Sequence, residues 1–279
     1  MKAFSQYLIF LLAALSNASP LPESSARSSC TTYTLLFARG TTETGTLGTV
    51  VGPGLETSVQ SALGTSQVTV QGVTYAADVA GITSEATGSG PGSVAMAQDA
   101  ATALSSCPNT KLILTGYSQG AIVVHNTATK LKASGQVSSV VAAVTFGDPY
   151  KTVLPAGIVT ADFHTFCASG DEVCAYGTGT CAGTGGCTSA STLGHLGYGA
   201  DVGAAATFIK SVVANAGSAS TATSALESAT SVSSSTSVSN SASDYGSGLG
   251  SLSTGLDISG FSIPTALPTS LSGFGITGM

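Results

Sequence analysis

The stretch Gly116-Tyr117-Ser118-Gln119-Gly120 carries the clearest chemical pattern in the sequence. An apolar run at 111–115 precedes it, and a helical pattern at 119–133 follows. A serine on such a strand-to-helix turn projects its hydroxyl outward, while the flanking glycines let strand and helix approach closely. The backbone N–H of Gln119, at the positive end of the helix, would face an oxyanion. The context predicts Ser118 as the nucleophile of an acyl transfer; the alternative is an ordinary turn with a chance pattern.

A serine hydroxyl is a weak nucleophile until a base takes its proton, and the chain has three histidines. His125 lies seven residues after Ser118 on the predicted helix, about 10 Å along the helix axis, so it cannot reach the hydroxyl. His164 falls inside a strand-like run and is interpreted as structural. His195 lies in a glycine-rich loop before the last helical pattern, and it completes the order serine, acid, histidine of α/β-hydrolase-like enzymes. We therefore predict His195 as the general base.

Four carboxylates compete as the acid that orients this histidine: Asp148, Asp162, Asp171 and Glu172. Asp171 follows the strand-like run that ends at Cys167, and it precedes Cys174. A disulfide between those two cysteines would close a small loop and hold the carboxylate at a fixed angle to the imidazole. Asp171 is the preferred acid on this reasoning, and Asp148 is the second choice.

The stretch 174–195, CAYGTGTCAGTGGCTSASTLGH, combines three cysteines, many glycines and His195. A structural zinc site needs about four tight ligands, which these side chains could supply. A phosphate-binding loop needs a strand directly before it and a helix directly after it, and neither pattern is present. The chain has six cysteines, and an even number in an exported protein favours disulfides. We therefore expect a disulfide-closed loop and no metal here.

Export is predicted from the first residues of the chain. Lys2 precedes an uninterrupted apolar run at 7–15, which is shorter than the roughly 20 residues that span a bilayer. Ser16 and Ala18 fit a cleavage site, so residues 1–18 are predicted to be a secretory signal peptide. Residues 19–27 would then be a pro-segment trimmed near Arg27. The mature protein is expected to be secreted and extracellular, with no membrane partner.

The composition of the chain narrows its partners and its organisation. A formal net charge of −6, with eight Lys and Arg and no basic cluster, argues against a nucleic-acid partner. Residues 215–243 are mostly Ser, Ala and Thr, which is typical of an O-glycosylated linker, and the Gly/Ser-rich residues 244–279 are predicted to be a flexible tail. The absence of tryptophan argues against a sugar-binding module in this part of the chain.

Residues 28–214 hold the predicted folded domain. Apolar strand-like runs lie at 32–38, 68–75, 111–115, 140–146 and 162–167. They alternate with helical patterns at 53–62, 94–106, 119–133 and 200–214. Strands as apolar as KLILT and VVAAVTF suit a sheet that is covered on both faces. The alternation predicts an α/β fold with a mostly parallel sheet.

Four blocks in this order resemble the cutinase family of serine esterases, in its fungal branch. They are 38–43 (ARGTTE), 116–120 (GYSQG), 167–174 with its enclosed Gly-Asp, and 195–198 (HLGY). The resemblance covers about residues 30–214. It implies a doubly wound, five-stranded, mostly parallel sheet of the α/β-hydrolase type without a lid. It also implies hydrolysis of cutin and similar polyesters, or of short-to-medium-chain acyl esters, by a monomer that needs no cofactor.

The resemblance implies roles for individual residues. Ser118 would be the nucleophile, His195 the general base and then acid, and Asp171 the orienting acid. The backbone N–H groups of Thr41 and Gln119, with the Thr41 hydroxyl, would form the oxyanion hole. The residues expected to bind substrate are Val173, Leu196 and Tyr117. Val173 and Leu196 have the alternative of simple packing.

The resemblance also implies a disulfide framework. It pairs Cys30 with Cys107 and Cys167 with Cys174, which leaves Cys181 to pair with Cys187. The loop before His195 is longer than is usual in the family, and we expect the extra pair to staple an enlarged rim at the active-site entrance.

Three further alternatives remain open at the level of the sequence. In the block ARGTTE, Arg39 and Glu43 could form an ion pair that fixes the loop of Thr41. An acetylxylan esterase would share the fold and the triad. A cell-wall or surface protein without catalysis could have kept the fold, with the Ser/Thr-rich tail as its functional part.

Overall fold

The computed structural model describes residues 30–230, and their side chains as far as residue 216. The predicted signal peptide (1–18), the pro-segment (19–27) and the tail (244–279) lie outside the described residues. The part of the predicted linker 215–243 that follows Thr230 lies outside them as well.

The predicted parallel α/β sheet is confirmed. Its five strands are β1 (Tyr33–Ala38), β2 (Val68–Gly72), β3 (Lys111–Tyr117), β4 (Val140–Phe146) and β5 (Phe163–Phe166). Neighbouring strands are all parallel, in the order β2-β1-β3-β4-β5. The chain therefore winds outward from β1 and β3 in both directions. Ligands of such sheets bind beyond the carboxyl ends of the strands at this switch point, between β1 and β3.

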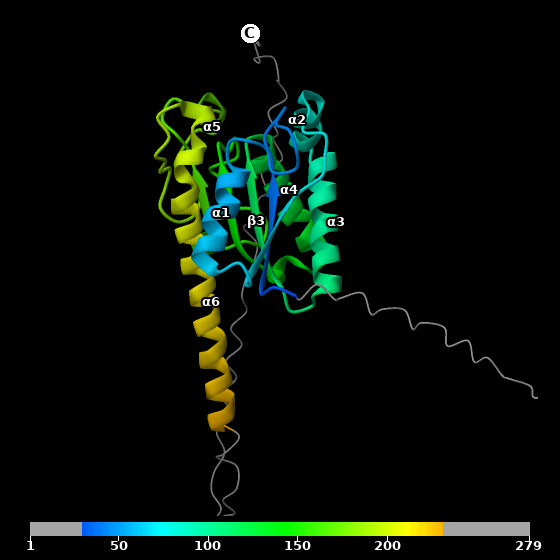
Figure 1. The fold of residues 1–279 in the computed structure, drawn as a ribbon, viewed down its shortest axis with the longest axis vertical. Helices are drawn as coiled ribbons and strands as arrows, with labels where there is room; N and C mark the ends of the chain where they lie inside the picture. Colours follow the sequence, from blue (N-terminus) through cyan, green and yellow to red (C-terminus); the bar gives the residue numbers. More distant parts are fainter. Residues whose placement is uncertain (1–29, 231–279) are drawn as a thin grey trace, which may run out of the picture. The chain divides into compact units, whose positions relative to one another are not determined.

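Helices cover both faces of the sheet. Figure 1 shows α1 (Gly52–Leu63) and α6 (Val202–Thr230) on one side, and α3 (Pro91–Ser106) and α4 (Gln119–Ala133) on the other. Successive strand residues point to opposite faces. In β1, Leu35 and Phe37 join the core under α1 and α6, while Leu36 and Ala38 join the core under α3 and α4. Burial on both faces explains why the strands are continuous apolar runs.

Short elements complete the end of the sheet where the arrow of β3 points in Figure 1. They are α2 (Val79–Ala86), α5 (Glu172–Ala175) and the 3-10 turns η3 (Gly194–Leu196) and η4 (Tyr198–Asp201). Two further 3-10 turns, η1 (Val137–Ser139) and η2 (Thr160–Asp162), precede β4 and β5. Between residues 30 and 230 no helix is long and apolar enough to cross a membrane.

The predicted end of the last helix at residue 214 is wrong, because α6 continues to Thr230. The predicted linker therefore begins inside a helix. The residues from 215 to 230 contain no proline and several alanines, the strongest helix former, so nothing in the backbone chemistry stops the helix at Ala214. A helix without an apolar stripe leaves no periodic pattern in the sequence, so its composition alone resembles that of a linker.

All six cysteines are paired in three disulfides. Cys30–Cys107 joins the segments that lead into β1 and β3, two neighbouring strands of the sheet. Cys167–Cys174 closes the loop between β5 and α5. Cys181 lies in one buried cluster with Cys167 and Cys174, so the second and third disulfides pack beside each other.

The loop closed by Cys181–Cys187 covers the outer edge of β5. The backbone N–H of Thr184 donates to Phe163 O at 2.8 Å, and the N–H of Ala182 donates to Lys151 O at 2.6 Å. β5 is an edge strand, and an uncovered edge invites pairing with other chains. The expectation that this pair staples the rim of the entrance is wrong, because no residue between 174 and 195 lines the cavity at Ser118.

We predict that replacing the pair (Cys181→Ala with Cys187→Ala) lowers the free energy of unfolding by about 2 kcal/mol, the loop-closure value for so short a loop. Because the loop lies away from the cavity, kcat and KM for a soluble ester should stay within about twofold of wild type. Urea unfolding and ester kinetics check the two parts. A change in KM without loss of stability would contradict this placement and would show that the loop acts at the entrance of the active site.

Candidate active site

Ser118 occupies a strained turn between the end of β3 and the start of α4. Its φ is 57°, a value that non-glycine residues rarely adopt. A Cβ on Gly116 would come within 2.1 Å of Gly120 O, and a Cβ on Gly120 within 2.0 Å of Ala38 O. Only glycines therefore allow β1, β3 and α4 to meet at this point. The turn leaves the serine side chain partly exposed at the carboxyl end of the sheet.

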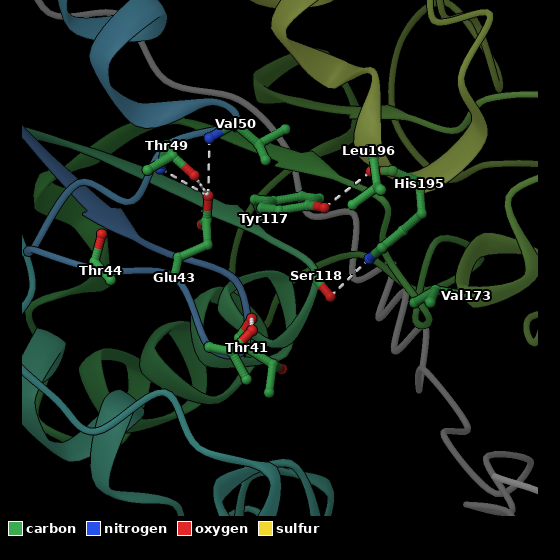
Figure 2. A pocket seen from close by; sticks show the side chains of 11 residues that line it. Thr41, Glu43, Thr44, Thr49, Val50, Tyr117, Ser118, Val173, His195 and Leu196 are labelled. Atoms are coloured by element: carbon green, nitrogen blue, oxygen red, sulfur yellow. Dashed lines mark hydrogen bonds between the residues drawn. The ribbon is translucent and has the colours of Figure 1, made fainter. Parts of the chain in front are cut away.

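Ser118, His195 and Asp171 are brought together in one hydrogen-bonded line. Ser118 Oγ lies 2.8 Å from His195 Nε2, the contact drawn in Figure 2. His195 Nδ1 lies 2.9 Å from each carboxylate oxygen of Asp171. The imidazole is 24% exposed and the carboxylate fully buried. A proton on Nδ1, donated to the carboxylate, leaves Nε2 free to accept the proton of the serine hydroxyl.

Asp171 is fixed as the N-cap of α5. Its Oδ1 accepts hydrogen bonds from the backbone N–H groups of Val173 at 2.8 Å and Cys174 at 3.4 Å. Its Oδ2 accepts a hydrogen bond from the Tyr198 hydroxyl at 2.5 Å. Burial alone would raise the pKa of Asp171, but the bonds from His195, Tyr198 and Val173 outweigh burial, and the pKa is lowered. The carboxylate is therefore held ionised beside the imidazole.

The position of His195 is set by its surroundings in η3. The Tyr117 hydroxyl donates to His195 O at 2.9 Å, and the two rings pack with their centroids 5.1 Å apart. Before the turn, the Asp201 carboxylate accepts bonds from Ser189 Oγ at 2.6 Å and Ala190 N at 2.5 Å. The glycine-rich loop thus reaches His195 through fixed contacts.

The competing residues of the sequence are placed elsewhere. Asp148 is fully buried, and its carboxylate lies 2.9 Å from Nε2 of His125, a residue of α4. His164 is buried, with Nδ1 bonded to Thr184 O, and burial lowers its pKa. The interpretation of His164 as structural agrees with its contact, and His125 lies within α4 and pairs with Asp148 instead of Ser118. Among the described residues, neither Asp162 in η2 nor the exposed Glu172 forms a hydrogen bond or ion pair with His195.

The loop after β1 and the start of α4 each offer an unused N–H. Within residues 30–230, the backbone N–H groups of Thr41 and Gln119 donate to no other group. Thr41 lines the same cavity as Ser118. The neighbouring Thr42 has a φ of 65° and donates its N–H to Ala77 O at 2.7 Å, and Ala77 itself has a φ of 50°. Strained backbone, held by this bond, therefore surrounds the position where an oxyanion would form.

The Gln119 side chain was not singled out from the sequence. It is 3% exposed, and its Nε2 donates to Asp78 O at 3.1 Å. Asp78 is the N-cap of α2 and accepts a bond from Gly81 N at 2.7 Å. The side chain of Gln119 therefore ties the start of α2 to the turn at Ser118.

Arg39 and Glu43 do not form the ion pair that the sequence suggested. The buried Arg39 guanidinium donates to backbone carbonyls instead, including Glu43 O at 2.8 Å and Ala76 O at 3.1 Å. The Glu43 carboxylate accepts from the N–H groups of Gly40 at 2.7 Å, Thr49 at 2.8 Å and Val50 at 2.8 Å. Each charge holds several backbone groups at once through charge-assisted hydrogen bonds, which one ion pair between the two side chains cannot do. Together they fix the loop of Thr41.

A cavity of about 610 Å³ opens at Ser118. Figure 2 shows Val173 and Leu196 beside His195, and Thr44, Thr49 and Glu43 on the other side of the serine. Leu196 is 70% exposed, so its apolar side chain is free to meet a ligand. Tyr117 lines the cavity but is buried and bonded to His195, so it also supports the imidazole.

The stretch 174–195 offers no thiolate for a metal, because its three cysteines are all in disulfides. Among the residues that the structure describes, no group of three His, Cys, Asp or Glu side chains could hold a metal ion. Zinc is the alternative set aside on sequence grounds for this stretch, and its three cysteines are not free to act as thiolate ligands.

The sequence profile described as Cutinase matches residues 29–213. A cutinase of Monilinia fructicola is 44% identical over 214 residues, which are 76% of this chain and 98% of the relative. Cutinase 4 of Emericella nidulans is 48% identical over 184 residues, 66% of this chain and 73% of the relative. The solved structure of Trichoderma reesei cutinase with a phosphonate inhibitor has a TM-score of 0.56 and 39% identity, covering 66% of this chain and 77% of that one.

We predict that Glu43→Gln lowers the free energy of unfolding by about 1–3 kcal/mol and kcat/KM by roughly tenfold. Both oxygens of the Glu43 carboxylate accept bonds from backbone N–H groups, but the amide has only one oxygen. Its NH₂ group would therefore face an N–H, and two donors cannot form a hydrogen bond. Urea unfolding and ester kinetics measure both effects. Glu56→Gln on α1 is the matched control, since between residues 30 and 230 the Glu56 carboxylate accepts a side-chain bond from Gln60 alone. Equal effects of the two variants would contradict the role given to Glu43.

The lowered pKa of Asp171 predicts a dependence of stability on pH. Its ionised form contributes stability fully above the ordinary value of 3.8, and this contribution is lost as pH falls below 3.8 through the folded value. As pH falls from about 5 to about 2, the free energy of unfolding of wild type should therefore decrease more than that of Asp171→Asn. Urea titrations at several pH values measure it, and a constant difference would show that the pKa is not lowered.

Proposed function

The chain belongs to the cutinase family and is a carboxylic ester hydrolase, and we propose that Ser118, His195 and Asp171 are its catalytic triad. The observation that supports the proposal is the continuous line of contacts, 2.8 Å from Ser118 Oγ to His195 Nε2 and 2.9 Å from Nδ1 to Asp171. These distances suit transfer of the serine proton to a histidine whose tautomer is fixed by a buried carboxylate.

In the proposed acylation step, Ser118 Oγ attacks the ester carbonyl carbon while His195 Nε2 takes the hydroxyl proton. The buried Asp171 stays ionised and stabilises the imidazolium that forms. His195 then gives its proton to the alcohol oxygen as the bond from carbon to that oxygen breaks. The alcohol leaves, and the acyl group remains on Ser118.

In the proposed deacylation step, water takes the place of the alcohol. His195 Nε2 removes a proton from the water as its oxygen attacks the acyl carbon. The proton then passes to Ser118 Oγ as the acyl–serine bond breaks, which releases the acid and restores the enzyme.

We assign the oxyanion of both steps to the N–H groups of Thr41 and Gln119, with the Thr41 hydroxyl as a further donor. The two N–H groups have no partner in the described part of the chain, and Gln119 begins α4, so the positive end of the helix adds to their effect. Each such donor contributes about 10²–10³ to kcat in comparable sites. Arg39 and Glu43 serve this hole indirectly, because their hydrogen bonds fix the loop that carries Thr41 before a substrate binds.

We propose that the substrates are cutin and similar polyesters, or short-to-medium-chain acyl esters. The relatives from Monilinia fructicola and Emericella nidulans cited above are both named cutinases. The partly exposed Ser118 and the exposed Leu196 suit a chain segment of a bulky or insoluble substrate, which need not enter a closed pocket. Val173 and Leu196, beside His195, would contact the apolar part of the ester.

Secretion and a monomeric state are part of the same proposal. Three disulfides suit an oxidising compartment, where such bonds persist, and a polymer substrate lies outside the cell. The net charge of −6 argues against a nucleic-acid partner, because such partners are bound mainly through Lys and Arg.

The proposal predicts that Ser118→Ala lowers kcat on p-nitrophenyl butyrate and on solid polyester by about 10⁴-fold or more. Ser105→Ala, at an exposed position on α3, is the matched control and should keep wild-type kinetics. Retained activity in Ser118→Ala would disprove the role of the serine.

A second assay separates the substrate classes. We expect release of acids from cutin and faster cleavage of butyryl than of acetyl esters. Release of acetyl groups from acetylated xylan, with no cleavage of butyryl esters, would replace the cutinase activity with that of an acetylxylan esterase.

A further inference from the structure

We infer that Tyr198 is a positioning residue that fixes the orientation and the charge of Asp171. It forms the inner end of a line of hydrogen bonds that starts at Ser118 and passes through His195. The inference rests on the proposed function, because it concerns how the proposed acid supports the proposed base.

The hydrogen bonds of Tyr198 allow one direction only. Its hydroxyl oxygen lies 2.9 Å from the backbone N of Ala168, and an N–H can only donate. The oxygen therefore accepts from Ala168, and the single hydroxyl hydrogen goes to the carboxylate oxygen Asp171 Oδ2 at 2.5 Å, because the other acceptor in reach, the disulfide sulfur of Cys174 at 3.7 Å, is weak. Tyr198 is thus a fixed donor to the carboxylate.

Burial makes this donor matter. The Asp171 carboxylate and the Tyr198 residue are both 0% exposed. Oδ1 has two backbone donors, from Val173 and Cys174, whereas Oδ2 has only Tyr198 besides the shared N–H of His195. Without the tyrosine hydroxyl, Oδ2 would be a buried charged atom with one shared donor, which is costly because water does not reach this carboxylate to replace the lost bond.

Tyr198 also connects the two loops that bear the acid and the base. It follows His195 by three residues, and its ring packs edge-on to the imidazole with centroids 6.1 Å apart. Its hydroxyl binds both ends of the loop that begins at Ala168, directly after Cys167, and reaches Asp171. The tyrosine therefore holds the acid relative to the base by a route that does not use the bond between them.

The charge of this group follows from its surroundings. Burial and the Asp171 carboxylate raise the pKa of Tyr198, so its hydroxyl stays protonated and remains a donor. A donated hydrogen bond draws charge from the carboxylate and weakens its hold on the proton of the imidazolium.

Other titratable groups surround the pair. The negative charge of Asp201 contributes to the raised pKa of Tyr198, but the Asp201 carboxylate accepts its hydrogen bonds from Ser189 and Ala190. The charges of Glu43 and Asp171 both contribute to the raised pKa of Tyr117. The Tyr117 hydroxyl, however, donates to His195 O, and the Glu43 carboxylate accepts from backbone N–H groups, so neither binds Asp171. Among described side chains, Tyr198 is therefore the titratable group that donates directly to Asp171 besides His195.

The test compares Tyr198→Phe with Tyr117→Phe, which also removes one buried hydroxyl beside His195 but not one bonded to the acid. Profiles of kcat/KM against pH are measured on p-nitrophenyl butyrate, with active enzyme counted by titration with an organophosphonate. We expect Tyr198→Phe to lower kcat by about tenfold and leave KM within about twofold. Because the carboxylate then holds the imidazolium proton more tightly, the acidic limb should move to higher pH, by about half to one unit. Tyr117→Phe should leave the limb in place.

A second variant keeps the test valid if Tyr198→Phe does not fold. Introducing 3-fluorotyrosine at position 198 by codon suppression keeps the hydroxyl and its size but makes it a stronger donor. The acidic limb should then move to lower pH, the opposite sign. A limb that stays unmoved with 3-fluorotyrosine, or that moves equally in Tyr117→Phe and Tyr198→Phe, would overturn the inference. Either outcome would leave the proposed function standing, since that depends on the loss of activity in Ser118→Ala.

Discussion

The turn that carries Ser118 is the constraint on which the rest of the site depends. A φ of 57° for a serine is unfavourable, and it persists because β3 and α4 are both packed into the sheet on either side of it. Gly116 and Gly120 have no Cβ, so the strand, the helix and β1 can approach within distances that any side chain would block. The strain places one hydroxyl at the switch point of the sheet, where the loop after β1 and the start of α4 each supply one unused N–H, from Thr41 and Gln119.

Around that hydroxyl, charged side chains hold the backbone in place. Glu43 and Arg39 each bind several backbone groups of the loop of Thr41 and form no ion pair with each other. Asp171 caps α5, and the disulfide Cys167–Cys174 closes its loop. A site built in this way has little left to rearrange as charge develops on a substrate, and such preorganisation is the largest source of rate in most enzymes of this type.

Much of this arrangement could be predicted from the sequence, because local patterns determine it. The bounds of β4 and α4 follow from an apolar run and from a helical pattern that starts at Gln119, and the serine turn is local in the chain. What could not be predicted depends on contacts between distant residues. The separate partners of Arg39 and Glu43, the bond from Tyr198 to Asp171, and the docking of the Cys181–Cys187 loop on β5 all depend on the packed structure. Tyr198 had one signal, its place three residues after His195, and that signal gave no role. The extension of α6 to Thr230 had a signal in the alanines and the missing prolines, but composition suggested a linker more strongly.

Labelling with an organophosphonate, followed by peptide mass spectrometry, tests most directly whether the strained turn makes Ser118 the nucleophile. Trypsin cleaves after Lys111 and Lys130, and the peptide 112–130 between them contains Ser118 and no other serine. The account predicts one phosphonate per chain, on Ser118 in this peptide, and none after denaturation in urea, when the turn and the contact to His195 are lost. Labelling of another residue, or equal labelling of the unfolded chain, would contradict it.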